Sequence, residues 1–161
     1  MQEKVFIGID AGKVCGVSFW NKAKKCFTSI ESYSFWECIE QLEGARKFYI
    51  PINDYDLTVV IEDVTQNSPV FFASTTYKTT KGNHESKIRA ACEQAKRVGM
   101  VWDKTELIIE WCERHKVKII KARPSSKSGT KMKADTFKNF TKWQGQTNEH
   151  GRDAALLVFS R

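Results

Sequence analysis

The sequence predicts an α/β fold in which helices flank one mixed central β-sheet of about five strands. The chain has 161 residues, of which 41% are hydrophobic and 28% charged, and this composition is typical of a globular domain with a buried core. Its apolar patterns give three strands, a helix, a strand, a long helix, a strand and further helices, an order that favours helices packed on a single sheet. Because no repeat or linker divides the chain, residues 1–161 are expected to form one domain.

Three strands are predicted near the N-terminus. Residues 5–9 form an apolar run that ends at Asp10, and residues 16–20 resume in β-favouring residues after a turn. This pattern predicts a hairpin. Residues 26–33 are predicted to supply the third strand.

A helix and a central strand follow. Apolar residues recur at helical spacing over residues 34–48, with Ser34 as the N-cap. Residues 57–62 are so uniformly apolar that they are typical of a strand buried on both faces, and Glu62 stands at its end. Residues 65–82 are polar, aromatic and irregular, which predicts a loop.

The longest helix signal begins at Asn83 and extends over some thirty residues. Two sets of residues recur every seven positions and together draw one apolar stripe: Ile88, Ala95, Trp102 and Ile109, and Ala91, Val98, Thr105 and Cys112. Either Gly99 interrupts this helix, or the stripe serves both the core and a second protomer. The periodicity therefore predicts a homodimer.

The C-terminal third is predicted to contain one more strand and two helices. Residues 117–120 read as the strand and residues 124–129 as a flexible basic loop. Residues 134–143 form a short helical pattern, and Asn148 can cap a last helix over residues 150–160.

Charge points to a polyanionic partner. Lys and Arg total 26 against 19 Asp and Glu, a net charge of +7. Residues 1–113 hold 14 basic and 16 acidic side chains, whereas residues 114–145 hold ten and one. A basic block in a balanced domain favours nucleic acid, with a solvated lysine face as the alternative. The block lacks the sustained apolar helix face that binding to a membrane surface needs.

The chain is expected to be a soluble cytoplasmic protein. No stretch approaches the roughly 20 apolar residues of a membrane span, and Asp10 precedes any signal-peptide core. The cysteines are odd in number and lack a C-x-x-C pair, so reduced core thiols are predicted rather than disulfides or zinc sites. They are Cys15, Cys26, Cys38, Cys92 and Cys112.

Several acidic and imidazole groups stand at the ends of predicted elements. Asp10 follows the first strand, although an Asp before Ala-Gly also suits a turn. A carboxylate on the strand of Glu62 must be paired, protonated or bound to a cation. Side chains alternate along a strand, so only one of Glu62 and Asp63 can join Asp10, and the pattern does not choose between them. His150 and Asp153 share a helix face, which a surface salt bridge explains almost as well.

This combination favours divalent-metal chemistry on a phosphodiester. Hard cations such as Mg²⁺ prefer oxygen ligands, and two ions about 4 Å apart can activate a water and stabilise a leaving oxygen. Lysines of the basic block would hold backbone phosphates without reading sequence: Lys127, Lys131 and Lys133. Four aromatic residues are candidates for stacking on bases, with core packing as the alternative: Phe71, Phe72, Tyr77 and Trp143.

Three short motifs carry a family resemblance. They are Ile7-Gly8-Ile9-Asp10-Ala11-Gly12, Val59-Val60-Ile61-Glu62 and His150-Gly151-Arg152-Asp153-Ala154-Ala155. In this order, over nearly the full length, the chain resembles the RuvC-like Holliday junction resolvases of the ribonuclease H-like superfamily, especially the small phage-borne forms. The resemblance implies a dimer that binds a four-way junction and nicks two strands symmetrically with Mg²⁺ or Mn²⁺, two ions per active site.

The resemblance also implies roles for individual residues. Asp10, Glu62 and Asp153 become metal ligands, and His150 takes a position where other members carry Asp or His. The choice of Glu62 over Asp63 comes from this match alone.

Outside the acidic residues the match is looser. Lys133 resembles a phosphate-contacting or transition-state lysine, with Lys131 as its competitor, and the long helix with Gln94 and Gly99 resembles a dimer-forming helix. An aromatic residue that some members use to open the junction would fall near Thr65. Phe71 or Phe72 would have to replace it.

The predicted function is a metal-dependent endonuclease for branched DNA, with water as nucleophile and products ending in 5′-phosphate and 3′-hydroxyl. One alternative is a nuclease of the same fold that acts on structured RNA, of the ribosomal RNA processing type. Another is a non-catalytic DNA-binding module that uses the basic block. Actin-like ATPases and sugar kinases also have a first phosphate loop in which Asp-x-Gly follows a strand, as at Asp10-Ala11-Gly12. Those proteins need two such domains and 161 residues supply one, so a nucleotide cofactor is not expected.

Overall fold

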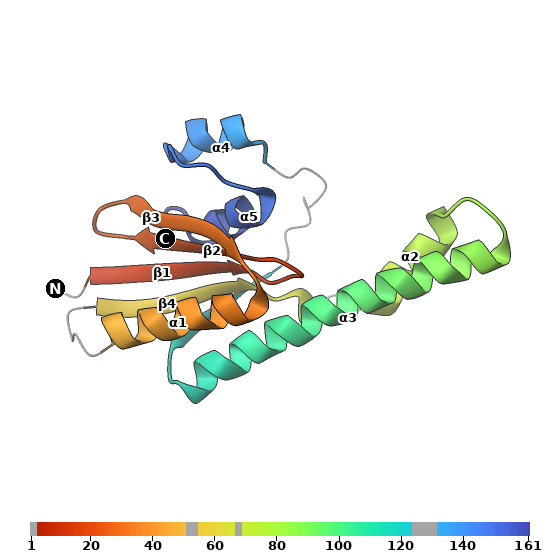
Figure 1. Ribbon diagram of the computed structural model, residues 1–161, viewed down its shortest axis with the longest axis horizontal. Coiled ribbons are helices and arrows are strands. Elements are labelled where there is room, and N and C mark those ends of the chain that lie inside the picture. The colour runs from red at the N-terminus through yellow and green to blue at the C-terminus, as the bar shows by residue number, and fades with distance from the viewer. Residues whose placement is uncertain (1–2, 51–54, 67–68, 124–131) are drawn as a thin grey trace.

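The structure, a computed structural model, describes residues 3–50, 55–66, 69–123 and 132–161. Its five strands form one mixed sheet in the order β3-β2-β1-β4-β5 (Figure 1). β2 pairs antiparallel with β1 and β3, whereas β1, β4 and β5 run parallel. The strand bounds are β1 Glu3–Asp10, β2 Cys15–Asn21, β3 Cys26–Tyr33, β4 Tyr55–Glu62 and β5 Lys118–Ala122. The α/β class and the five-stranded mixed sheet predicted from the sequence are confirmed.

Helices cover both faces of the sheet (Figure 1). α1 and α3 pack on one face, and α4 and α5 lie over the other. α2 packs along the N-terminal half of α3, and together they project from the body as an arm. The bounds are α1 Phe35–Tyr49, the 3-10 helix η1 Val64–Gln66, α2 Pro69–Thr79, α3 His84–Arg114, α4 Ala134–Thr141 and α5 Glu149–Val158.

The alternation of side chains along the strands divides the core into two clusters. Val5, Ile7 and Ile9 of β1 belong to the cluster under α1 and α3. Phe6 of β1 and Val60 of β4 belong to the cluster under α5. The central strands are therefore apolar on both faces, as the uniform apolar run of β4 predicts.

Helix α1 begins where the sequence indicates. The Ser34 side chain accepts a hydrogen bond from the backbone N–H of Glu37, and the Glu37 carboxylate accepts one from the backbone N–H of Ser34. This reciprocal capping box satisfies two N–H groups that the first turn of a helix would otherwise leave without partners.

The loop predicted over residues 65–82 is wrong, because most of this segment is helical. η1 follows β4 directly, and α2 begins at Pro69, a residue that the first turn of a helix tolerates. α2 is rich in Thr and aromatic residues of low helix propensity and is held by packing on α3.

Helix α3 is continuous through Gly99, so of the two alternatives the interruption at Gly99 does not occur. The C-terminal half of its apolar stripe faces the chain's own sheet, where Thr105, Ile109 and Cys112 are buried. Ile88, at the other end of the stripe, is 44% exposed. Much of the stripe thus serves the chain's own core, and the homodimer stays a prediction.

Other expectations differ only in detail. The last strand extends to Ala122, and the helix predicted to reach residue 143 ends at Thr141 because Lys142 adopts a left-handed conformation with φ of 62°. The basic loop predicted at 124–129 lies outside the described residues. None of the described helices is both long enough and apolar enough to span a membrane.

The prediction of core thiols holds for three of the five cysteines. All five are free thiols, and Cys15, Cys38 and Cys112 are buried. The prediction is wrong for Cys26 and Cys92, which are exposed.

Candidate active site

Two of the predicted carboxylates lie side by side at one edge of the sheet. In the parallel register of β1 and β4, Ile9 pairs with Ile61, so Asp10 and Glu62 follow together at the carboxyl ends of neighbouring strands. By the alternation of side chains, Glu62 faces the same way as Val60, toward α5. Parallel strand ends of this kind are the usual location of binding groups in α/β sheets.

Two glycines let α5 approach this edge of the sheet. A Cβ atom at Gly16, which pairs with Asp10 in the sheet, would lie 2.0 Å from the carbonyl oxygen of His150. A Cβ atom at Gly8 would lie 2.1 Å from the carbonyl oxygen of Ala154. Only glycine allows such contact. The first turn of α5 therefore rests on the sheet at the level of Asp10.

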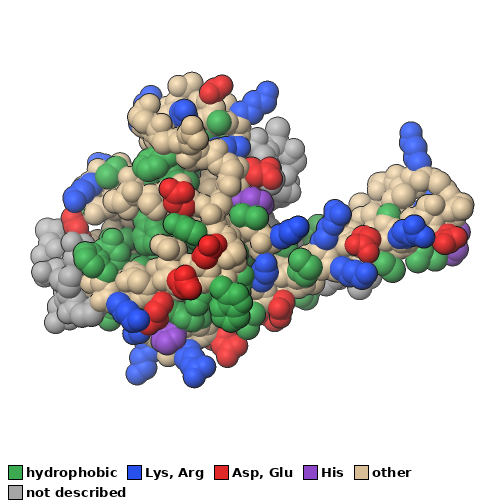
Figure 2. Space-filling model, in the orientation of Figure 1, with side chains coloured by type: hydrophobic (Ala, Val, Ile, Leu, Met, Phe, Trp, Pro, Cys, Tyr) green, Lys and Arg blue, Asp and Glu red, His purple; other side chains and the backbone are tan. Residues whose placement is uncertain are grey.

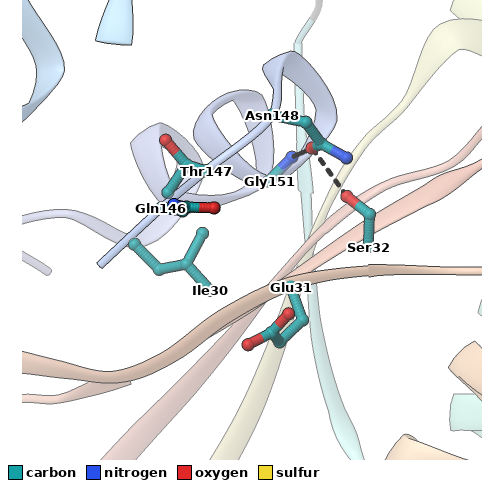
Figure 3. A pocket seen from close by; sticks show the side chains of 7 residues that line it. All are labelled: Ile30, Glu31, Ser32, Gln146, Thr147, Asn148 and Gly151. Atoms are coloured by element: carbon teal, nitrogen blue, oxygen red, sulfur yellow. Dashed lines mark hydrogen bonds between the residues drawn. The ribbon is translucent and has the colours of Figure 1, made fainter. Parts of the chain in front are cut away.

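The start of α5 is fixed by its N-cap residue (Figure 3). Oδ1 of Asn148 accepts hydrogen bonds from the backbone N–H of Gly151 at 2.9 Å and from Oγ of Ser32 at 2.7 Å. The second bond joins the start of α5 to β3, and both of its residues line a small cavity together with Ile30 and Thr147. Asn148 thus fixes both the helix start and its position on the sheet.

His150 contacts Asp10 directly. Nδ1 of His150 lies 2.9 Å from Oδ2 of Asp10, and the two side chains are 30% and 22% exposed. An ionised carboxylate can only accept a hydrogen bond, so Nδ1 carries the hydrogen, and in the neutral imidazole Nε2 then keeps its lone pair. Nε2 lies 3.8 Å from Oε1 of Glu149, beyond hydrogen-bond distance. The imidazole is thereby prepared to accept a proton or bind a cation at Nε2.

Asp153 lies one turn further along α5, on the same side of the sheet. Its side chain is half-buried, and the next residue, Ala154, contacts the sheet at Gly8. Asp10 and Asp153 therefore lie on the same side of the sheet, as a shared site requires.

Asp63 is used in a local turn. It is 8% exposed, and Oδ1 accepts hydrogen bonds from both the backbone N–H and the hydroxyl of Thr65. This turn directs the chain from β4 into η1. The strand alternation and the turn together favour Glu62 as the carboxylate that faces α5, a choice that the sequence pattern left open.

The predicted ligands are neighbours but are not gathered around one point. Among the described residues, no group of three or more His, Cys, Asp or Glu side chains lies close enough together to hold a metal ion. The described part of the chain includes Asp10, Glu62, His150 and Asp153. The donor chemistry suits a hard cation, and an ion held by all of them would need these side chains to lie closer together than they do here.

Lys133 is placed close to α5 by a residue that the sequence did not single out. Lys133 is the exposed N-cap residue of α4. Nε of Arg152 donates a 2.8 Å hydrogen bond to the carbonyl oxygen of Met132, the residue before Lys133, and Nη1 of Arg152 donates one to the carbonyl oxygen of Thr147. Arg152 lies inside the third motif, between His150 and Asp153, and its position there is the only signal that pointed to it.

The structure gives a mixed answer for the predicted nucleic-acid contacts. Lys127 and Lys131 lie outside the described residues, as does the side chain of Phe71. Phe72 is half-buried on α2. Trp143 packs edge-on against Phe27 in the core, so core packing is the correct interpretation there.

The arm carries a second basic surface. Residues 69–103 contain six Lys or Arg and three Asp or Glu, and in Figure 2 blue basic side chains are prominent along the arm. The charge count over residues 1–113 as one segment did not reveal this excess of basic side chains, because the rest of that segment is acidic. A charge count by predicted element would have found it.

The comparisons with known proteins identify no relative: no family model, no curated protein and no solved structure matches the chain. Fold and site therefore define its class: an α/β protein with a five-stranded mixed sheet, in which Asp10 and Glu62 end two neighbouring parallel strands and His150 of α5 contacts Asp10.

Proposed function

We propose that the protein is a divalent-metal-dependent endonuclease of ribonuclease H-like fold that resolves Holliday junctions and other branched DNA by paired symmetric nicks. Water is the nucleophile, and Mg²⁺ or Mn²⁺ is the cofactor. The substrate class in this proposal is inferred from the family resemblance of the three motifs. In this proposal the enzyme acts in the cytoplasm.

One observation carries the proposal. The 2.9 Å contact between His150 and Asp10 joins residues 140 positions apart, and it lies where Glu62 ends the adjacent parallel strand. An ion pair with only a structural role would not need a second carboxylate, Glu62, at the end of the neighbouring strand and on the sheet face toward α5. A site for a hard cation requires several carboxylate oxygens converging from different elements.

The chain's own residues have separate tasks in this proposal. Asp10, Glu62 and Asp153 would hold the ions, with His150 contributing Nε2 while Asp10 orients its ring. Bound divalent ions supply activation of water and stabilisation of charge on the phosphate. Lys133, at the exposed start of α4, would neutralise a backbone phosphate near the site.

The basic residues of the arm support binding of a large nucleic acid. The arm extends the positive surface well beyond the acidic edge of the sheet (Figures 1 and 2). Contacts of this kind act on the phosphate backbone and position the substrate without reading its sequence. That property suits a nuclease selective for branched structure.

Paired nicks call for two active sites, and a groove between α1 and α3 supports a homodimer. The groove is lined mainly by apolar side chains, including Phe35, Trp36, Ile39, Leu107 and Trp111. Trp36 is 73% exposed, an unusual state for so large an apolar group. In the proposed dimer a second copy covers it. Light scattering should give twice the 18.5 kDa chain mass, and Trp36→Glu should give a folded monomer; a wild-type monomer would contradict the dimer.

The function is tested with a synthetic four-way junction in Mg²⁺, alongside linear duplex, flap and structured RNA. Wild type should make a symmetric pair of nicks in the junction. Asp10→Asn and Glu62→Gln should bind the junction normally but cleave it at least about 10³-fold more slowly, since metal-held charge stabilisation contributes several kcal/mol. Glu40→Gln, an exposed carboxylate on α1, is the matched control and should cleave normally.

Three results would contradict the proposal. Normal cleavage by Asp10→Asn would remove the catalytic assignment. Faster cleavage of RNA than of the junction would favour the RNA nuclease. Salt-sensitive DNA binding without cleavage under any divalent ion would favour the non-catalytic module.

A further inference from the structure

A side chain of α3 holds the turn that follows Asp10. Nζ of Lys104 donates a 2.7 Å hydrogen bond to the carbonyl oxygen of Gly12, two residues beyond Asp10. Lys104 is half-buried, and its ammonium group lies 5.9 Å from the ring centroid of Phe35. Lysines usually extend their charged ends into water. This one is directed inward, to the backbone of the turn between β1 and β2.

A second side chain of α3 holds the segment that follows Glu62. Nε1 of Trp102 donates a 2.9 Å hydrogen bond to the carbonyl oxygen of Val64, two residues beyond Glu62. The chain is therefore held in the same way after each candidate carboxylate. The residue two positions beyond Asp10, and likewise beyond Glu62, has a backbone carbonyl that accepts a hydrogen bond from α3.

The two donors act from one rigid segment. Residues two positions apart on a helix point in nearly opposite directions, so Trp102 and Lys104 reach the segments that follow β4 and β1 from different sides of α3. Immediately after Lys104, the buried residues Thr105, Ile108 and Ile109 fix α3 in the core. The backbone pairing of β1 with β4 sets the spacing of the strands, and α3 ties the segments that follow Asp10 and Glu62 to one rigid helix.

We propose that Trp102 and Lys104 are positioning residues that fix the relative placement of Asp10 and Glu62 and so set the divalent-metal affinity of the site. This inference rests on the proposed function. Neither residue touches the reacting atoms.

The test uses the full chain with Lys104→Met and Trp102→Phe, which remove the donor and keep most of the apolar bulk. Mn²⁺ alone is titrated, and the Mg²⁺ dependence of junction cleavage is measured. Each variant should raise the Kd for Mn²⁺ and the half-maximal Mg²⁺ concentration about three- to tenfold, the equivalent of one net hydrogen bond. The cleavage rate at saturating Mg²⁺ should stay within about twofold.

Two further variants separate positioning from general destabilisation. Lys104→Arg keeps a donor and should restore the wild-type metal dependence, whereas Lys47→Met removes an exposed lysine on α1 and should leave it unchanged. Unchanged metal dependence in both Lys104→Met and Trp102→Phe, or failure of Lys104→Arg to restore it, would overturn the proposal.

Hydrogen exchange keeps this inference distinct from the proposed function. If wild type neither binds Mn²⁺ nor cleaves DNA, the proposed function fails. Amide exchange on the metal-free chain then decides the positioning role: faster exchange at residues 11–14 in Lys104→Met and at 64–66 in Trp102→Phe supports it, and unchanged exchange there overturns it.

Discussion

Replacing Gly16 by Ala tests how α5 is brought to Asp10. The added Cβ atom would lie 2.0 Å from the carbonyl oxygen and 2.4 Å from the carbonyl carbon of His150, whereas Cβ contacts under 3.0 Å are essentially never seen. The first turn of α5 must therefore retreat by about 1 Å or more. A retreat of that size lengthens the 2.9 Å contact between His150 and Asp10 to roughly 3.9 Å, too long for a hydrogen bond.

The expected cost of this overpacking is about 1–3 kcal/mol of unfolding free energy. For a chain of this size the melting temperature should fall by about 2–12 °C. The matched control is Gly44→Ala in α1, where the new Cβ meets nothing within 4 Å; it should stabilise the protein by about 0.5–1 kcal/mol.

Thermal unfolding measures the stability, and an imidazole ¹⁵N–¹H correlation spectrum reports the hydrogen bond at Nδ1 of His150. Gly16→Ala should be less stable than wild type and should lose the protected Nδ1–H signal. A Gly16→Ala variant as stable as Gly44→Ala, with that signal intact, would refute this account of how α5 is positioned.

Two other predictions concern stability. Phe137→Ala should cost about 3–5 kcal/mol of unfolding free energy, because the Phe137 side chain of α4 is fully buried in the core. Phe140→Ala on the same helix, 55% exposed, should cost less than about 1 kcal/mol in urea unfolding; equal losses would contradict this assignment of the core. Hydrogen bonds from Arg46 lower the pKa of Glu43 from 4.5 to about 2. A lowered folded-state pKa stabilises the fold above about pH 4.5 and loses that effect as the pH falls toward 2. Glu43→Gln should therefore have a lower urea midpoint than wild type at neutral pH, and the two midpoints should converge as the pH falls. A difference in urea midpoint that does not change with pH would contradict this.

The strands could be predicted because buried strands show a recognisable pattern of apolar residues. The run at residues 57–62 is apolar at consecutive positions, which only a strand covered on both faces requires, and β4 occupies it. α2 could not be predicted, because residues 69–79 have weak intrinsic helix preference and depend on α3 for packing. Local patterns indicate an element where its own residues carry the pattern of burial, and they fail where helix formation depends on packing against another element.

The candidate site could be predicted only in part. The motifs selected Asp10 and His150, but their contact depends on how closely α5 approaches the sheet, a tertiary property. Gly8 and Gly16 gave a usable signal, since glycine inside a strand indicates close approach of another backbone. The choice between Glu62 and Asp63 could not be made from alternation alone. It depends on which face of the sheet α5 packs against, and the sequence pattern does not give that face.

A crystal structure grown with Mn²⁺, with its anomalous scattering map, tests most directly whether the fold brings these carboxylates to a common ion. Strong peaks should appear within about 2.0–2.3 Å of carboxylate oxygens of both Asp10 and Glu62, with Asp153 or His150 completing the coordination. Peaks absent from this edge of the sheet at saturating Mn²⁺, or bound to Asp10 while Glu62 and Asp153 remain directed elsewhere, would contradict the account.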